Sequence, residues 1–531
     1  MRSNGAIGEV QRPSSALYLR RIFDRFEDCR EPCYRHPGGD LRYCDLHAGV
    51  LGLLSRFAAF GLAADIQRPV LIWGHKDHRY VIAYWACLLS GRALVPVEPE
   101  TPLERVRQIA ATSNACAVVI ADTADCGGAV ENLELLLPIL RVLDGEIDSN
   151  HGARLDTLVS TAGIRDDAVA YIMFSSGTLG QPKGIQVTYA NLVDFIGWLD
   201  VLLPEAASFR AVSGNIRYCF DVSLFELWAA WVHRLPMTAL DHANFANSTA
   251  YIQRLKEARV ALWVSTPSIV RLYLKNKRFN GAMLPDCKTF VFCGEPLTKV
   301  IVRDLFARFP GCRVVNTYGP TECTVAVTGV DIQESHLESE HELPIGYARP
   351  GTRLELAAGL EEQGAGGEIH IRGRSVGRGY VGLPEKQAAA FPESQLYRTG
   401  DWGWQAEDGL WYFKGRIDRE VKIQGLRIDL DDVETHIRNR AGVEDVVVGV
   451  FTLDGQPRGL KAFVVGPETA EDLCKLSEEL AEELPHYLVP KFWHAGFETR
   501  LNNNSKLDRQ AVLGDTTVSA VRYVHAHQAD T

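Results

Sequence analysis

Hydrophobic residues along most of this chain fall into short apolar runs that are separated by longer amphipathic stretches. The apolar runs predict buried strands at 93–97, 115–121, 168–174, 261–264, 289–292 and 312–316. The amphipathic stretches predict helices at 77–91, 103–114, 268–275 and 299–309. Strands that alternate with helices are typical of parallel sheets with crossover helices, so we expect an α/β fold. Such sheets bind ligands beyond the carboxyl ends of their strands.

The pattern changes after about residue 350. Residues 367–373 alternate between apolar and polar with period two, which is typical of a half-buried strand. Asp408 and Gly409 lie between two strand-like runs and predict a hairpin turn. From about residue 419 the pattern predicts a small separate unit, with elements at 431–441 (helix), 446–451 and 460–465 (strands) and 470–484 (helix). After about residue 515 we expect a loose tail.

Length and charge narrow the possible classes of protein. A chain of 531 residues exceeds one ordinary domain, and an apolar share of 46% is ample for large cores. The chain has 56 Lys and Arg against 67 Asp and Glu, a net charge of −11, which argues against a general nucleic-acid or membrane-surface binder. We find no secretory signal and no membrane-spanning stretch, so we expect a cytoplasmic protein. The 12 scattered cysteines predict buried reduced thiols and no structural metal.

One loop has the composition of a phosphate site. Residues 175–184 follow a predicted strand and contain serines, a threonine, three glycines and Lys183. Glycines let the backbone approach an anion, hydroxyls and amides donate to its oxygens, and lysine adds positive charge. Lys183 lies between Pro182 and Gly184, so the loop is not a Walker motif. The alternative is an ordinary surface turn.

Further polar segments follow in the second half of the chain. Residues 316–322 come after a predicted strand and end in Glu322, and one carboxylate beside nucleotide phosphates is enough for Mg²⁺. A plain strand-to-loop turn is the alternative there. Asp401 has a carboxylate that would suit the paired hydroxyls of a ribose, although this signal is weak when taken alone. Residues 415–428 and 504–509 complete the series.

In this order the segments resemble the motifs of the adenylate-forming superfamily: acyl-CoA synthetases, luciferases and the amino-acid adenylation domains of peptide synthetases. The resemblance extends from about residue 40 to 510. It implies an N-terminal core at 1–417, with parallel or mixed sheets, flanking helices and a small barrel-like β part. It also implies a small mobile α+β lid at 418–515, a tail at 516–531, and an active site between core and lid that uses ATP and Mg²⁺.

The resemblance implies which residues contact the nucleotide. These positions are Ser175, Ser176, Gly177, Thr178, Lys183, Asn316, Thr317, Tyr318, Thr321, Asp401, Arg416 and Lys506. Thr178 is expected near the β- and γ-phosphates and Tyr318 against the adenine. Asp401 and Arg416 are expected at the ribose hydroxyls.

Three other roles follow from the same resemblance. Glu322 would hold Mg²⁺, and Asp418 would be the hinge of the lid. Lys506 would act as the catalytic lysine, together with Thr178, by bridging the acyl carboxylate and the α-phosphate. A lysine that donates to both groups reduces the repulsion between two anions and stabilises the transition state. Without the resemblance, a lysine in a polar loop is usually just solvated.

Asp221 suggests the class of acid. It resembles the aspartate that pairs with the α-ammonium in amino-acid-activating members, whereas the alternative is an N-cap of a helix at 223–228. Residues 262–268, 290–295 and 316–327 further resemble the D-alanine:D-alanyl carrier protein ligases. In that group a cysteine at the position of Cys293 is associated with preference for the D-enantiomer, although a small buried residue is the alternative. The implied pocket consists of Asp221, Val222, Phe225, Val264, Val291, Cys293, Thr317, Val325 and Ala326.

The resemblance therefore implies a two-step ligase that forms an aminoacyl-AMP and passes the acyl group to a carrier-protein thiol. The bulky Phe225 favours a small amino acid. Hydrophobic pockets separate one methyl group by only about 1–3 kcal/mol, so D-alanine, glycine and L-alanine stay open in that order. No carrier domain follows Lys506, so we expect a separate carrier protein. We also expect the enzyme to be a monomer. An acyl- or aryl-CoA ligase is the first alternative, and a degenerate member that only binds a nucleotide or partner is the second.

Overall fold

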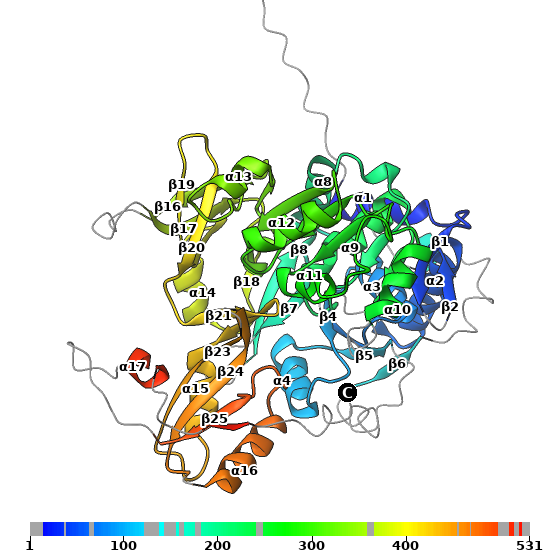
Figure 1. Ribbon diagram of the computed structural model, residues 1–531. Helices are drawn as coiled ribbons and strands as arrows, with labels where there is room; N and C mark the ends of the chain where they lie inside the picture. The colour runs from blue at the N-terminus through cyan, green and yellow to red at the C-terminus, as the bar shows by residue number, and fades with distance from the viewer. Residues whose placement is uncertain are drawn as a thin grey trace, which may run out of the picture.

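The computed structural model describes most of the chain. The described residues are 14–36, 39–62, 68–121, 137–142, 155–158, 164–175, 182–240, 248–357, 366–453, 456–467, 469–496, 509–514 and 520–522. Figure 1 shows a large body of helices and sheets, with the orange and red C-terminal elements gathered below it. The predicted α/β fold is confirmed, since mixed sheets with flanking helices make up the large body.

One large sheet carries the predicted phosphate loop. Its described strands run in the order β18 (Gly379–Tyr380), β8 (Lys183–Thr188), β7 (Val169–Ser175), β4 (Leu94–Val97), β3 (Val70–Trp73), β5 (Ala117–Ile120) and β6 (Ile139–Arg141). The strands from β7 to β6 are parallel, while β8 and β18 extend the sheet in antiparallel fashion. All residues of β3, β4 and β5 are buried, which explains why these runs are continuously apolar.

A second large sheet carries the other nucleotide segments. Its described strands run in the order β15 (Tyr347–Ala348), β14 (Thr328–Asp331), β13 (Arg313–Tyr318), β12 (Thr289–Phe292), β11 (Leu262–Ser265), β9 (Val212–Gly214), β10 (Met237–Ala239), β1 (Pro32–His36) and β2 (Gly39–Arg42). Its centre, from β13 to β1, is parallel. Carboxyl ends of parallel strands meet at one edge, so the segments after β9, β12 and β13 can share a site.

Helices cover both large sheets. In the described residues they are α1 (Ser15–Asp24), α2 (Tyr43–Ala59), α3 (His78–Leu89), α4 (Leu103–Ser113), α7 (Leu155–Leu158), α8 (Tyr189–Leu202), α9 (Ser223–His233), α10 (Ser248–Glu257), α11 (Pro267–Leu274) and α12 (Lys299–Arg308). α3 is buried on all sides apart from its first residue, as expected of a helix inside a core. The ring of Trp85 in α3 packs against the rings of Trp228 and Trp231 in α9, with centroid distances of 5.4 and 5.1 Å.

A smaller antiparallel sheet follows, made of β16 (Thr352–Leu356), β17 (Gly367–Gly373), β19 (Leu396–Gln405) and β20 (Trp411–Arg416). Along the chain, the short helix α13 (Glu334–Glu338) precedes β16, and the short helix α14 (Pro384–Ala390) lies between β17 and β19. The predicted turn at Asp408 and Gly409 is confirmed, since it joins β19 to β20. The register of this hairpin places Asp401 directly opposite Arg416.

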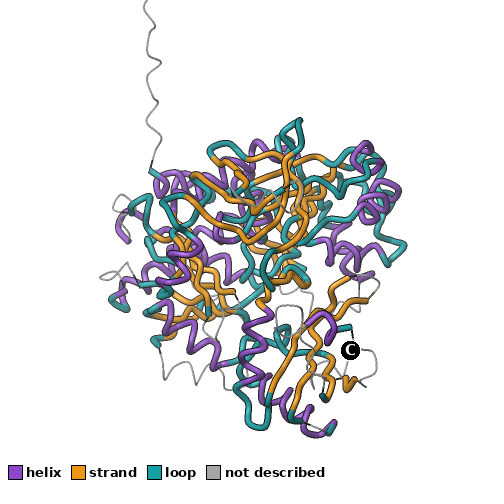
Figure 2. The backbone as a smooth tube through the Cα atoms, turned by 90° about the vertical axis from the view of Figure 1, so that its left-hand side faces the viewer, coloured by secondary structure: helices purple, strands orange, loops and turns teal. Residues whose placement is uncertain are grey.

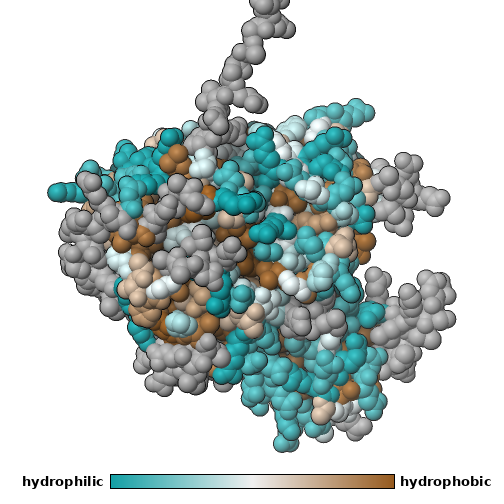
Figure 3. Space-filling model, turned by 180° about the vertical axis from the view of Figure 1, so that it is seen from behind, coloured by the Kyte–Doolittle hydropathy of each residue, from teal (hydrophilic) through white to brown (hydrophobic). Residues whose placement is uncertain are grey.

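The C-terminal elements have a core of their own. A two-stranded hairpin, β21 (Glu420–Ile423) and β22 (Leu426–Asp429), leads into a sheet of β23 (Asp445–Leu453), β24 (Gln456–Val465), β25 (Phe492–Ala495) and β26 (Ala520–Arg522). The helices here are α15 (Leu430–Arg438), α16 (Ala470–Ala481) and α17 (Arg509–Leu513). Figure 2 shows the same group at the lower end of the molecule. In Figure 3 the lower part of the visible surface is mainly hydrophilic.

The expected loose tail needs one correction. Residues 520–522 form β26, which pairs with β25 from Phe492 to His494. The unpaired backbone groups of β25 at the sheet edge offer hydrogen-bond partners to any extended segment that reaches them. Three residues are too short for a strand signal in the sequence, so the pairing could not be predicted from the pattern.

Candidate active site

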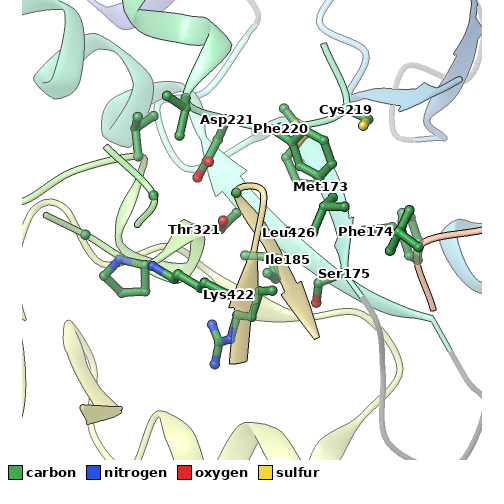
Figure 4. Close-up of a pocket in the computed structure, with 18 of the residues that line it drawn as sticks. Met173, Phe174, Ser175, Ile185, Cys219, Phe220, Asp221, Thr321, Lys422 and Leu426 are labelled. Carbon is green, nitrogen blue, oxygen red and sulfur yellow. The ribbon is translucent and has the colours of Figure 1, made fainter. Parts of the chain in front are cut away.

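A cavity lies between the large body and the β21–β22 hairpin. Its wall includes Ser175 at the end of β7, Asp221 and Val222 before α9, Gly294 after β12, Thr321 after β13, Asp401 and Arg416 of the smaller sheet, and Lys422, Gly425 and Arg427 of the hairpin. In Figure 4 the hairpin, which carries Lys422, lies beside Asp221 and Thr321. The structure thus brings together segments that are far apart in the sequence.

Asp221 has an unusual environment within this cavity. The residue is only 7% exposed, and Oδ2 is buried with no hydrogen-bond partner among the described residues. Burial raises the pKa of Asp221 to about 6, although the Thr321 hydroxyl and the charge of Lys422 act in the opposite direction. α9 begins at Ser223 with Val222 as its N-cap, so the side chain of Asp221 is not the helix cap. Its carboxylate is therefore available to a positively charged ligand.

The other predicted pocket residues fall into two groups. Val222 and Val325 line the cavity next to Asp221. The rest are buried and lie outside the residues that line it: Phe225, Val264, Val291, Cys293, Thr317 and Ala326. The ring of Phe225 packs edge-on against Phe195 at 5.2 Å, and Sγ of Cys293 lies 3.8 Å from the Val325 carbonyl oxygen. These buried side chains therefore pack behind the cavity wall.

The residues expected at the adenosine contact one another. The Tyr318 hydroxyl donates to Oδ2 of Asp401 at 2.5 Å, and Nη1 of Arg416 donates to Oδ1 at 2.7 Å. Arg416 also contacts the hinge candidate Asp418, whose side chain is 46% exposed. The predicted contact Asn316 is buried and donates from Nδ2 to the Pro344 carbonyl at 2.7 Å.

Glu322 is the centre of the charge cluster in the site. It is fully buried, and the Tyr380 hydroxyl donates to Oε1 at 2.9 Å. Nη1 of Arg427 donates to both of its carboxylate oxygens, at 3.0 and 2.8 Å, and Nζ of Lys183 lies 3.4 Å from Oε1. Burial alone would raise the pKa of Glu322, but the charges of Arg427 and Lys183 lower it to about 2. A carboxylate that stays ionised among hydrogen-bond donors suits a magnesium–phosphate site.

Several predicted residues lie outside the part of the chain that the structure describes. They are Ser176, Gly177 and Thr178 of the phosphate loop and the catalytic candidate Lys506. Their positions relative to the cavity stay predictions. The two ends of the loop are described, since Ser175 lines the cavity and Lys183 is buried beside Glu322.

Known proteins resemble this chain in sequence and in fold. A family model described as "AMP-binding enzyme" matches residues 27–381, which is more than half of the chain.

The chain belongs to the AMP-binding enzyme family.

Relatives of this AMP-binding enzyme include D-alanine–D-alanyl carrier protein ligases. One from Bacillus cereus is 32% identical over 470 residues, which cover 85% of this chain and 90% of the relative. The Vibrio cholerae adenylation domain AlmE, solved with glycyl-adenosine-5′-phosphate, superposes with a TM-score of 0.77 at 21% identity, covering 96% of this chain and all of that one. An NRPS protein with adenylation and PCP domains gives a TM-score of 0.76 at 23% identity, over 94% and 84% of the two chains. The chain is thus an AMP-forming ligase whose family uses ATP.

Some side chains at the cavity of this AMP-binding enzyme were given no role from the sequence. Lys422, Arg427 and Glu420 lie in a recognised motif, but nothing in the local pattern says that a hairpin of the C-terminal unit inserts into the cavity. Tyr487 also lines the cavity, and the sequence carries no signal for it. Among the described helices, none is long and apolar enough to cross a membrane.

Proposed function

We propose that this enzyme activates a small amino acid as its aminoacyl-AMP and then passes the acyl group to the phosphopantetheine thiol of a separate carrier protein. D-Alanine is the first candidate, followed by glycine and L-alanine. One observation carries the proposal: a buried carboxylate, Asp221, faces the cavity with an oxygen that has no hydrogen-bond partner among the described residues. The relatives named D-alanine–D-alanyl carrier protein ligase support the choice of amino acid and of acceptor.

The electrostatics of Asp221 favour an amino acid over a simple carboxylic acid. Burying an ionised carboxylate is costly unless a cation pairs with it, and the raised pKa of Asp221 expresses that cost. An α-ammonium group at Oδ2 would supply the missing partner. A fatty or aromatic acid would leave the carboxylate unpaired and would add an apolar group beside it, which is unfavourable.

The shape of the site favours a short side chain. Phe225 and Cys293 fill the space behind the cavity wall rather than lining an open pocket. A hydrogen atom or a methyl group needs little room beside Asp221, whereas a longer side chain would have to displace buried residues. Cys293 contacts the backbone of Val325, which lines the cavity, so it would act on the position of the substrate methyl group through Val325.

The remaining site residues fit the first chemical step. With the lid turned about Asp418, Lys506 would bridge the substrate carboxylate and the α-phosphate, while Thr178 and Lys183 would hold the outer phosphates. Asp401, Arg416 and Tyr318, which already contact one another, would bind the nucleoside. Mg²⁺ at Glu322 would neutralise charge on the phosphates. Positioning and charge stabilisation together would supply the rate enhancement.

Amino-acid-dependent exchange of pyrophosphate into ATP tests the first step. A panel of D-alanine, glycine, L-alanine, larger amino acids, fatty acids and aryl acids should give exchange with the three small amino acids only. A second assay follows transfer of the labelled amino acid to candidate phosphopantetheinylated carrier proteins, with CoA as the competing acceptor. Exchange with a fatty or aryl acid and transfer to CoA would instead establish a CoA ligase.

A further inference from the structure

The β21–β22 hairpin brings two charged side chains, Glu420 and Arg427, into the nucleotide site. The two side chains pair with each other, and only 12% and 16% of their respective areas is exposed. The turn of the hairpin is closely seated, because the Gly425 amide donates to Oε1 of Glu295 at 2.7 Å. Gly425 has a φ of +84°, and a Cβ there would lie 2.7 Å from Cγ2 of Thr266. No larger residue could adopt this position without a shift.

Arg427 is bound to the carboxylate of Glu322, which is the group that would bind the metal. Its Nη1 donates to both oxygens of Glu322, and Oε1 also accepts from Tyr380. A guanidinium in this position covers the lone pairs that Mg²⁺ would need on the same carboxylate. Arginine and magnesium at Glu322 are therefore mutually exclusive.

Glu420 pairs with Lys183, the cation expected at the phosphates, and with Arg416, the cation expected at the ribose. Oε1 of Glu420 lies 3.6 Å from Nζ of Lys183, and Oε2 lies 2.7 Å from Nη2 of Arg416. Lys183 belongs to the predicted phosphate loop, and Arg416 reaches the neighbouring Asp401. A carboxylate between these two cations uses positive charge that a phosphate group would otherwise find there.

We propose that the hairpin is an internal substitute for magnesium pyrophosphate, with Arg427 in place of the metal and Glu420 in place of a phosphate. When the hairpin withdraws, it removes one charge of each sign, and Glu322 and Lys183 keep each other as partners, with the Tyr380 hydroxyl still bonded to Glu322. That is the arrangement which complements a metal–phosphate group. The proposal rests on the proposed function only in taking magnesium pyrophosphate as the product of the first step.

The consequence is an enforced order of events. The hairpin can seat in the arrangement seen here only after magnesium and pyrophosphate have left, and magnesium pyrophosphate should in turn displace the seated hairpin. Glu420 and Arg427 are thus positioning residues, because they act through the placement of the hairpin rather than on the reacting atoms. Their effect is a competition for the same partners, which is measurable without any amino acid or carrier protein.

Hydrogen exchange followed by mass spectrometry measures this competition in the full-length enzyme. Peptides that contain residues 420–429 report on the seated hairpin, because the Gly425 amide is bonded to the large body. Titration with magnesium pyrophosphate should speed exchange in these peptides in a saturable way. Magnesium chloride alone and pyrophosphate alone should each have a weaker effect, because each competes with only one of the two charged side chains.

Substitutions then show which charged side chains hold the hairpin in the site. Arg427→Gln should speed hairpin exchange about tenfold or more without any ligand, since it leaves Glu322 without that partner. Arg427→Lys should restore much of the protection, because it keeps a cation at Glu322. Glu420→Gln should lower the concentration of pyrophosphate that releases the hairpin. Arg440→Gln and Glu483→Gln are matched controls, since they break an ion pair inside the C-terminal unit, and they should leave hairpin exchange unchanged.

Kinetics give a second readout. Arg427→Gln should slow transfer from a preformed aminoacyl-AMP by a larger factor than it slows ATP–pyrophosphate exchange. The proposal is wrong if magnesium pyrophosphate leaves hairpin exchange of the unmodified enzyme unchanged, or if Arg427→Gln and Arg440→Gln behave alike. If no small amino acid supports exchange but the hairpin still responds to magnesium pyrophosphate, the substrate assignment fails and this proposal stands.

Discussion

Asp221→Asn should change activity and stability in opposite directions. Asparagine has nearly the same shape but cannot pair ionically with an ammonium group. Removing one member of a buried ion pair costs about 3–5 kcal/mol, which corresponds to a loss of roughly 10²- to 10⁴-fold in the amino-acid-dependent kcat/KM. ATP binding itself should change little, because Asp221 is not among the hydrogen-bond partners of Asp401 and Arg416.

The same substitution should stabilise the free enzyme at neutral pH. Burial raises the pKa of Asp221 from 3.8 to about 6, so ionisation of this group opposes folding. A difference of about two in pKa corresponds to about 3 kcal/mol at pH 7, to order of magnitude. The favourable contribution of Asp221 is complete below pH 3.8 and is lost as the pH rises through 6. The advantage of asparagine should therefore be absent near pH 3.8 and full above pH 6.

Thermal unfolding and pyrophosphate exchange, measured on the same samples between pH 4 and 8, check the expected gain in stability and the expected loss of activity. Asp77→Asn is the matched control, because Asp77 is also buried but accepts from the Arg79 amide and pairs with its guanidinium at 3.1 Å. That variant should lose stability and keep its exchange activity. Our account of Asp221 would be refuted if Asp221→Asn lowered the unfolding temperature at pH 7 and left exchange unchanged.

Three further substitutions test the other assignments. Glu322→Gln should slow exchange and raise the Mg²⁺ concentration needed for half-maximal rate, whereas an unaltered Mg²⁺ titration would argue against a metal ligand. Lys506→Ala should abolish exchange with an unchanged circular dichroism spectrum, and retained exchange would remove its catalytic role. Cys293→Ala should change the D- to L-alanine preference by up to about 3 kcal/mol, measured as the ratio of kcat/KM values. An unchanged ratio would show that this cysteine does not determine the stereochemical preference.

Much of the fold could be predicted because its elements have clear local signals. The helix expected at 77–91 is α3 at His78–Leu89, and the strand expected at 367–373 is β17 with the same bounds. Buried parallel strands are continuously apolar, and the chain marks them with turns and amphipathic helices on either side. β26 could not be predicted, since its pairing depends on an exposed sheet edge and not on its own three residues.

The motifs of the candidate site could be predicted from the sequence, but the way their side chains contact one another could not. Asp401 and Arg416 belong to different motifs, and the register of β19 with β20 makes them cross-strand partners. For Cys293 the sequence left two alternatives open, contact with the substrate Cα or simple burial, because the residue follows a strand that is buried throughout and the pattern does not say which side faces a ligand. Insertion of Lys422 and Arg427 depends on how two units meet, and local sequence carries no record of that.

The most direct test of the account compares pairs of acids that differ only in the amino group: alanine against propanoic acid, and glycine against acetic acid. The measurement is ATP–pyrophosphate exchange with the unmodified enzyme and with Asp221→Asn, at equal concentrations of each acid. We predict a preference for the amino acids of about 10²-fold or more, which collapses in the variant because the carboxylate that pairs with the ammonium is gone. Equal exchange with both members of each pair in the unmodified enzyme would contradict the claim that this ligase activates an amino acid.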